Sequence, residues 1–213
     1  MLRAAAVLLA CALALAPARL PAAATVEVTV LDAKGAGVAD AVVSLLRTDG
    51  PAAPIAPGRV EIAQQDQEFL PYVTVVPVGT EVEFPNRDDI QHHIYSLSKA
   101  KRFEKPLYAP GAHESVVFDQ PGVVTLGCNI HDWMVAYVVV VPTPHHAKTD
   151  AAGAARVAVP PGRYRLEVWH PRLAAPETRE VEAGPAGASF RLEVKLRPDR
   201  RIRRTPEGKA AGY

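Results

Sequence analysis

The chain has 213 residues, and 48% of them are hydrophobic, which is enough to bury the core of one large domain or two small ones. Its 24 basic and 23 acidic residues give a formal net charge of +1. Loss of an N-terminal leader that carries Arg3 and Arg19 would leave 22 basic residues against 23 acidic ones. A charge so close to zero argues against a nucleic-acid-binding protein.

Residues 1–24 have the composition of a secretory signal peptide. Arg3 precedes an apolar run over 4–16, and the small residues of 21–24 follow as a cleavage site. This run is too short to span a bilayer, and no later run reaches about 18 apolar residues. We therefore expect an exported, periplasmic protein that begins near Thr25 and has no transmembrane segment. A lipid anchor at Cys11 is less favoured, because it would leave an apolar segment shorter than about 7 residues.

Alternation of apolar and polar residues predicts β-strands along most of the remaining chain. The first two are expected at 26–30 and 41–46, before a proline-rich linker at 51–58. The basic, proline-bearing stretch 99–111 is expected to form a surface loop or a short helix. The other strands of the central region are expected at 60–63, 73–76, 81–84, 90–97, 114–118, 123–126 and 135–141.

After Pro142 the pattern of the N-terminal strands returns. No stretch of the chain resembles an amphipathic helix longer than about ten residues, so we expect an all-β fold class. The basic stretch 197–213 lacks periodicity and is expected to be a flexible tail. The last strands are expected at 156–159, 164–169, 178–181 and 190–196.

Three metal-binding side chains, Cys128, His131 and Met134, lie within seven residues of one another. A thiolate, an imidazole and a thioether suit a copper ion that changes between two oxidation states, with the thioether as a long, weak axial ligand. If Cys11 is removed with the leader, Cys128 is left in an oxidising compartment without a second cysteine for a disulfide. A buried structural cysteine is the alternative, but the spacing of the histidine and the methionine favours metal ligation.

A site of this kind usually takes a second imidazole from another strand, and His92 and His93 are the candidates. Side chains alternate along a strand, so His92 shares a face with Ile94, and His93 shares the other face with Tyr95 and Leu97. Because both faces carry an apolar residue, alternation leaves the choice open.

The remaining histidines are expected to be surface residues. His113 falls in a predicted loop, His170 at a strand end, and the pair at 145–146 in an exposed linker. The sequence has no Gly-rich phosphate loop, no nucleophilic serine motif and no paired carboxylates placed for acid–base chemistry. We therefore expect no independent enzymatic activity.

Residues 60–141 resemble a cupredoxin, the Greek-key β-sandwich of small blue copper proteins. The segment 82–86, Val-Glu-Phe-Pro-Asn, with His92 six residues after Asn86, is similar to the plastocyanin segment in which Phe-x-Asn precedes the first histidine ligand. The motif Cys-x-x-His-x-x-Met at 128–134, followed by a valine strand, has the ligand spacing of amicyanin.

The resemblance implies one type 1 copper ion, with Asn86 ordering the loop before the first ligand. His93 stands where cupredoxins usually have Asn or Ser, so it remains the second candidate for that ligand. Backbone N–H groups of Gly127 and Asn129 are expected near the thiolate. The ligands implied are His92, Cys128, His131 and Met134.

The flanking segments resemble the two halves of a carboxypeptidase regulatory-like (transthyretin-like) β-sandwich, a small immunoglobulin-like fold. Its signatures are Thr-Asp-x-x-Gly at 149–153 and Pro-Pro-Gly-x-Tyr-x-Leu at 160–166. We expect a copper domain at 58–142, inserted between 25–57 and 143–196. In the simpler alternative, the N-terminal strands extend the cupredoxin and a separate C-terminal domain follows.

The expected function is single-electron transfer between periplasmic redox partners, such as a dehydrogenase or a cytochrome docking near His131. A copper carrier or sensor that binds the metal without redox cycling is the alternative. A third possibility is a β-sandwich binding module with a degenerate copper motif. The presence of all four ligand types weighs against the third possibility.

Overall fold

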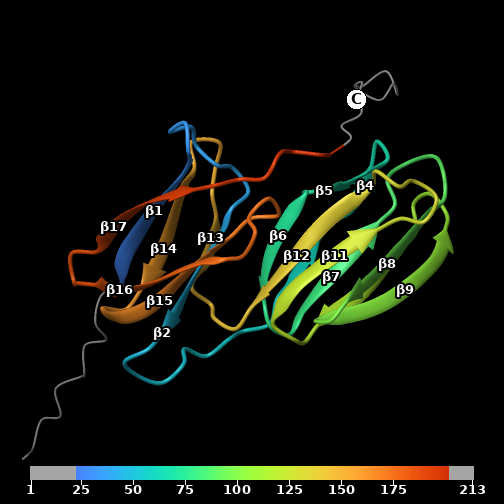
Figure 1. Cartoon of the computed structure of the whole chain (residues 1–213). Helices are drawn as coiled ribbons and strands as arrows, with labels where there is room; N and C mark the ends of the chain where they lie inside the picture. The colour runs from blue at the N-terminus through green and yellow to red at the C-terminus, as the bar shows by residue number, and fades with distance from the viewer. Residues whose placement is uncertain (1–22, 202–213) are drawn as a thin grey trace, which may run out of the picture.

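The structure, a computed structural model, describes residues 23–201, and within that range the chain forms seventeen strands and no helix (Figure 1). This confirms the all-β prediction. In the described part of the chain there is accordingly no helix long and apolar enough to cross a membrane. Nearly all of the predicted signal peptide, including Cys11, lies outside the described residues, as do residues 202–213 of the basic tail.

Strands from both ends of the chain form one β-sandwich, on the left of Figure 1. In one sheet β1 pairs antiparallel with β14 and parallel with β17, and the second sheet has the order β13-β2-β15-β16. Alternate residues of β1 and β15 face the common core, where Tyr164 is fully buried. The strands are β1 (Ala24–Asp32), β2 (Val42–Arg47), β13 (His146–Lys148), β14 (Ala154–Val159), β15 (Gly162–Trp169), β16 (Glu177–Ala183) and β17 (Ala188–Val194).

The central segment forms a β-sandwich of its own, the central sandwich. Its larger sheet has the order β6-β12-β11-β8-β9, its smaller sheet has the order β10-β7-β3, and β4 and β5 form a separate hairpin. The strands are β3 (Arg59–Glu61), β4 (Ala63–Gln65), β5 (Glu68–Leu70), β6 (Val73–Pro77), β7 (Thr80–Pro85), β8 (His92–Ser98), β9 (Lys101–Tyr108), β10 (His113–Phe118), β11 (Gly122–Gly127) and β12 (Val135–Val141). The insertion of 58–142 as an independently folding domain stays a prediction.

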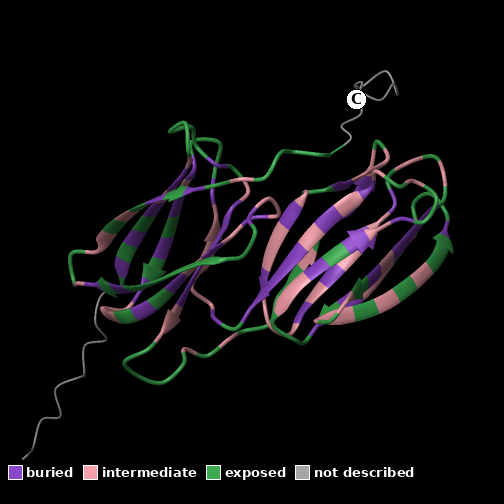
Figure 2. Ribbon diagram, viewed as in Figure 1, coloured by how far each residue is buried: buried purple, intermediate pink, exposed green. Residues whose placement is uncertain are grey.

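An apolar interface joins the two sandwiches, and it explains the almost continuous valine run of β12. Ala136, Val138 and Val140 face the core of the central sandwich, while Val139 and Val141 pack with Val42 of the other sandwich. With both faces covered, β12 has no need for alternating polar residues. Figure 2 shows only buried and half-buried residues along β12, whereas half-buried and exposed residues alternate along most of β9.

The prediction of a loop or short helix at 99–111 is wrong, because Lys101–Tyr108 form β9. This strand lies at the edge of its sheet, where Pro106 costs no ladder hydrogen bond and most side chains reach solvent. Its sequence therefore lacks the apolar alternation of an interior strand.

Two predictions for the outlying histidines are also wrong. His145 and His146 are half-buried, and His146 begins β13, which pairs with β2. His170 is only 8% exposed. His113 is exposed, as expected, but it begins β10.

Candidate metal centre

The loop 128–134 connects the antiparallel strands β11 and β12, whose last register pair is Gly127 with Val135. Cys128 and Met134 are buried, with 3% and 1% of their surfaces exposed, and both belong to the core of the central sandwich. His131 is half-buried, and its carbonyl oxygen accepts a 2.9 Å hydrogen bond from the Met134 N–H. The loop therefore turns back on itself between the imidazole and the thioether.

The structure brings His92 of β8 to this loop. One potential ligand atom from each of His92, Cys128 and His131 lies within 4.8 Å of the other two. The Cys128 Sγ and His131 Nδ1 atoms are 3.9 Å apart, and the His92 and His131 ring centroids are 5.1 Å apart. A sulfur and two imidazole nitrogens thus meet in one partly buried cluster.

A carboxylate orients His92, whose side chain is fully buried. Its Nε2–H donates to Asp88 Oδ2 at 2.6 Å, and Asp88 also accepts hydrogen bonds from the backbone N–H groups of Asp66 and Gln67. The buried Nδ1 of His92 has no hydrogen-bond partner among the described residues. A protonated Nε2 leaves the lone pair on Nδ1, which is the arrangement that a metal-binding histidine requires.

His93 points away from the cluster. Its Nε2–H donates to Glu104 Oε1 at 2.9 Å, and its ring lies beside Tyr95 with the centroids 5.5 Å apart. The β8–β9 register is irregular between His92 and Ile94, the position that His93 occupies. His92, and not His93, is therefore the imidazole that lies with Cys128 and His131.

The surroundings of Cys128 favour the thiolate. Burial raises the pKa of this thiol, but the adjacent His92 side chain and hydrogen bonds from the backbone N–H groups of Ile130, His93 and His131 outweigh burial, so that the pKa is lowered. The backbone donors differ from the expected Gly127 and Asn129. Burial lowers the pKa of His92, but the nearby Cys128 and Asp88 side chains have the larger combined effect and raise it.

Asn86 orders the loop before His92, as predicted. Its Nδ2 donates to the carbonyl oxygens of Ile90, at 2.8 Å, and Tyr108, at 3.3 Å, and its Oδ1 accepts the Asp88 N–H at 3.1 Å. Asn86 is only 1% exposed, so these bonds also satisfy its buried amide.

Sequence reasoning missed Asp88 and the β4–β5 hairpin. The turn of this hairpin, Asp66–Gln67, supports the cluster from two directions. Its N–H groups hold Asp88, and the Gln67 carbonyl oxygen accepts a 3.1 Å hydrogen bond from Trp133 Nε1. Both turn residues have positive φ, of 55° and 57°, which fits a tight hairpin turn. The sequence signal was an acid four residues before a histidine, which is too common to be informative.

These residues fit a copper ion. The donors are a sulfur of lowered pKa, an orphaned imidazole nitrogen and a second imidazole, with a buried thioether next in the loop. Such a mixed soft donor set suits copper, and two imidazoles, a thiolate and a distant thioether form the usual electron-transfer site.

No protein-family model and no curated protein matches the chain. Solved structures similar to part of it include a purple cupredoxin from Nitrosopumilus maritimus, at 28% identity and a TM-score of 0.35, covering 38% of this chain and 99% of that one. A copper-containing nitrite reductase from Thermus scotoductus is 25% identical, with a TM-score of 0.37, over 46% of this chain and 25% of that chain. A reduced amicyanin variant is 20% identical, with a TM-score of 0.37, over 46% of this chain and 98% of its own. Each similarity covers less than half of this chain.

Proposed function

We propose that the protein is an exported, periplasmic carrier of single electrons with one type 1 copper site formed by His92, Cys128, His131 and Met134. The observation that supports this most strongly is the meeting of one sulfur and two imidazoles within 4.8 Å at a loop that also carries a buried thioether. A copper ion bound by such donors supplies one-electron oxidation and reduction.

The proposal requires the protein to hold the donor atoms in a geometry that changes little between the two oxidation states of copper. Three of the four donors share the loop 128–134, which is closed by β11 and β12, and the fourth is fixed by Asp88. Cys128 is only 3% exposed and belongs to the same buried core as Leu126 and Met134, so its sulfur is largely shielded from water. A rigid, dry donor set limits the rearrangement that accompanies electron transfer and favours cycling over simple carriage of the metal.

The half-buried ring of His131 is the proposed point of electron entry and exit. It lies beside the Trp133 ring, with the centroids 5.1 Å apart, and Asp132 between them in sequence is exposed. Among the proposed ligands His131 is the most exposed, because the other three are buried. A redox partner docked over this loop would be separated from the bound copper ion only by the width of the His131 imidazole ring.

Voltammetry of the copper-loaded protein tests this function. We expect a reversible one-electron wave and an unchanged oxidised spectrum after repeated reduction and reoxidation. Release of copper to a chelator on reduction, without a reversible wave, would instead identify a copper carrier. Absence of any enzymatic turnover is part of the proposal, and the electron is expected to pass to a second redox protein.

A further inference from the structure

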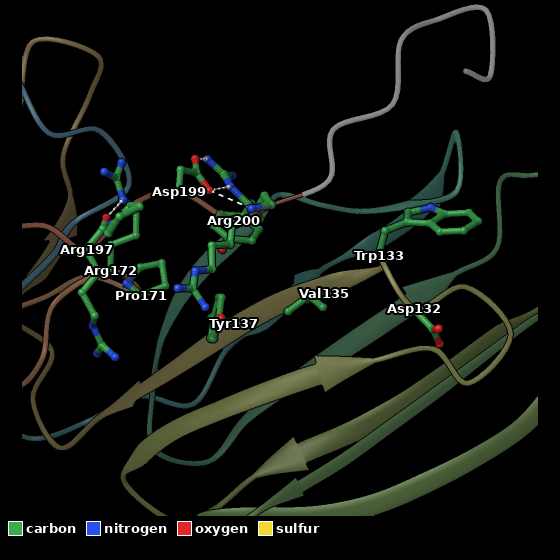
Figure 3. A pocket seen from close by; sticks show the side chains of 12 residues that line it. Asp132, Trp133, Val135, Tyr137, Pro171, Arg172, Arg197, Asp199 and Arg200 are labelled. Carbon is green, nitrogen blue, oxygen red and sulfur yellow. Dashed lines mark hydrogen bonds and ion pairs between the residues drawn. The ribbon is translucent and has the colours of Figure 1, made fainter. Parts of the chain in front are cut away.

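A cleft of about 540 Å³ lies beside the candidate metal loop, between the two sandwiches (Figure 3). Asp132 and Trp133 of the loop line it, together with Tyr72 and Tyr137 of the central sandwich. The opposite wall comes from the other sandwich, through Pro171, Arg172 and residues 197–201. We call this hollow the interdomain cleft.

The interdomain cleft is rich in arginine. Its lining includes Arg172, Arg197, Arg200 and Arg201, against only two carboxylates, Asp132 and Asp199. Asp199 forms an ion pair with Arg201, with 3.0 Å between Asp199 Oδ2 and Arg201 Nη2. The cleft therefore carries a surplus of two positive charges within a protein whose overall charge is close to zero.

Two of these arginines, Arg172 and Arg197, are held by hydrogen bonds to backbone carbonyl oxygens. Arg172 Nε donates to the Arg197 carbonyl oxygen at 2.6 Å, and the Arg197 N–H donates back to the Arg172 carbonyl oxygen at 2.9 Å. The Arg197 guanidinium also donates to the Leu173 carbonyl oxygen. Because these acceptors are neutral carbonyls, the bonds position the guanidinium groups without cancelling their charge.

The segment 197–201 is also attached to the central sandwich. The Arg201 guanidinium carbon lies 3.9 Å from the centroid of the Tyr72 ring, which is a cation–π contact. Tyr72 in turn packs edge-on against Tyr137, with the centroids 5.4 Å apart. The first five residues of the basic tail thus bridge the two sandwiches beside the metal loop.

We propose that the interdomain cleft docks an acidic segment of the redox partner, an inference that rests on the proposed electron-transfer function. Arginine is suited to this task because its planar guanidinium binds a carboxylate through two parallel hydrogen bonds. Arginine, tyrosine and tryptophan are the residues that most often dominate binding at protein interfaces, and all three line the cleft. A segment bound there would contact Asp132 and Trp133, next to His131.

This assigns a role to the second sandwich, the one formed by strands from both ends of the chain. Arg172 and the segment 197–201 follow strands of that sandwich, and they supply all the positive charge of the cleft. The central sandwich supplies the redox site and the aromatic floor. Steering by opposite charges speeds the encounter of two proteins and orients them, so the second sandwich would set which partner reaches the metal loop.

The test is an NMR titration of the isotopically labelled, metal-free protein with a hexaglutamate peptide. We expect saturable shifts of the Trp133 indole signal. Arg200→Glu should weaken binding about tenfold, and Arg172→Gln about threefold, since exposed ion pairs contribute modestly. Added salt should weaken binding further.

Arg191→Glu is the matched control, because Arg191 is exposed on β17 and does not line the cleft. It should change the affinity less than twofold. Equal losses in the Arg191 and Arg200 variants would show non-specific charge attraction and overturn the proposal, as would the absence of Trp133 shifts. Citrate binding as tightly as the peptide would identify a small-anion site and also overturn it. Because no copper is present, failure here is distinct from failure of the copper proposal, which shows in the spectrum.

Discussion

Asp88→Asn should weaken copper binding about 10- to 100-fold. The buried His92 ring donates from Nε2 to Asp88 at 2.6 Å, and the Asp88 side chain is only 11% exposed. The asparagine has the same shape but only one acceptor oxygen. If that oxygen faces His92, the amide NH2 is set against the Asp66 N–H. In the other orientation the NH2 meets the His92 N–H or moves the ring proton to Nδ1, the nitrogen needed for the metal. A hydrogen bond to a charged group contributes about 1.5–3 kcal/mol. At about 1.4 kcal/mol per factor of ten, this gives the stated loss, which is also typical of partners that orient metal-binding histidines.

Competition with a chromogenic Cu(I) chelator measures this affinity. Asp89→Asn is the matched control, because Asp89 is the neighbouring residue, carries the same charge and is exposed. It should stay within about threefold of the unmodified protein, since an exposed charge is well screened. Equal losses in the two variants would show that only net charge matters, and an unchanged affinity in Asp88→Asn would refute the orienting role of the carboxylate.

Three further predictions concern the ligand, pH dependence and domain structure. His92→Ala should abolish the thiolate-to-copper absorption band, whereas His93→Ala should retain it, because His93 faces Glu104. Burial and Arg172 lower the pKa of His170 to about 4, against 6.5 in the unfolded chain, so unfolding takes up a proton between these values. Stability should therefore fall by up to about 3 kcal/mol as the pH drops from 6.5 to 4, as measured by urea unfolding. Excision of 58–142 should leave a remnant with cooperative thermal unfolding.

Each of these has a contrary outcome. An intact band in His92→Ala would reassign the ligand to another imidazole. His170→Gln should remove the fall in stability between pH 6.5 and 4, whereas His113→Gln, at an exposed position, should leave it in place. The same dependence of stability on pH in both variants would show that His170 is not responsible. The charged groups near His170 are Arg172, Arg201, Asp40 and Asp199. A remnant without a cooperative transition would show that the second sandwich requires the apolar contact between Val42 and β12.

The all-β fold and the grouping of Cys128 with His131 follow from local sequence. Alternating valines predict the strands. Cys128 and His131 are three residues apart in one loop, so these two donors stay close however the rest of the chain folds. The same reasoning identifies the second imidazole only as one of two candidates, His92 or His93. Alternation separates His92 from His93, but it does not reveal which face meets the loop.

The remaining features depend on contacts between segments far apart in the sequence. Asp88 can orient His92 only because the β4–β5 turn, twenty-odd residues earlier, donates its N–H groups to the carboxylate. The edge strand β9 has no apolar alternation because solvent covers much of it. From the sequence alone, the segment 197–201 has only the features of a basic tail. Its contact with the Tyr72 ring through Arg201 is evident only in the folded structure. Local pattern predicts elements, whereas these contacts require the assembled fold.

The visible absorption spectrum after addition of one equivalent of Cu(II) tests the central claim most directly. The metal-free mature protein should develop an intense thiolate-to-copper band that saturates at one copper per chain. Cys128→Ser, which removes the sulfur but leaves both imidazoles, should bind copper without this band. A colourless complex of the unmodified protein, or a band that persists in Cys128→Ser, would contradict the assignment of a type 1 copper site.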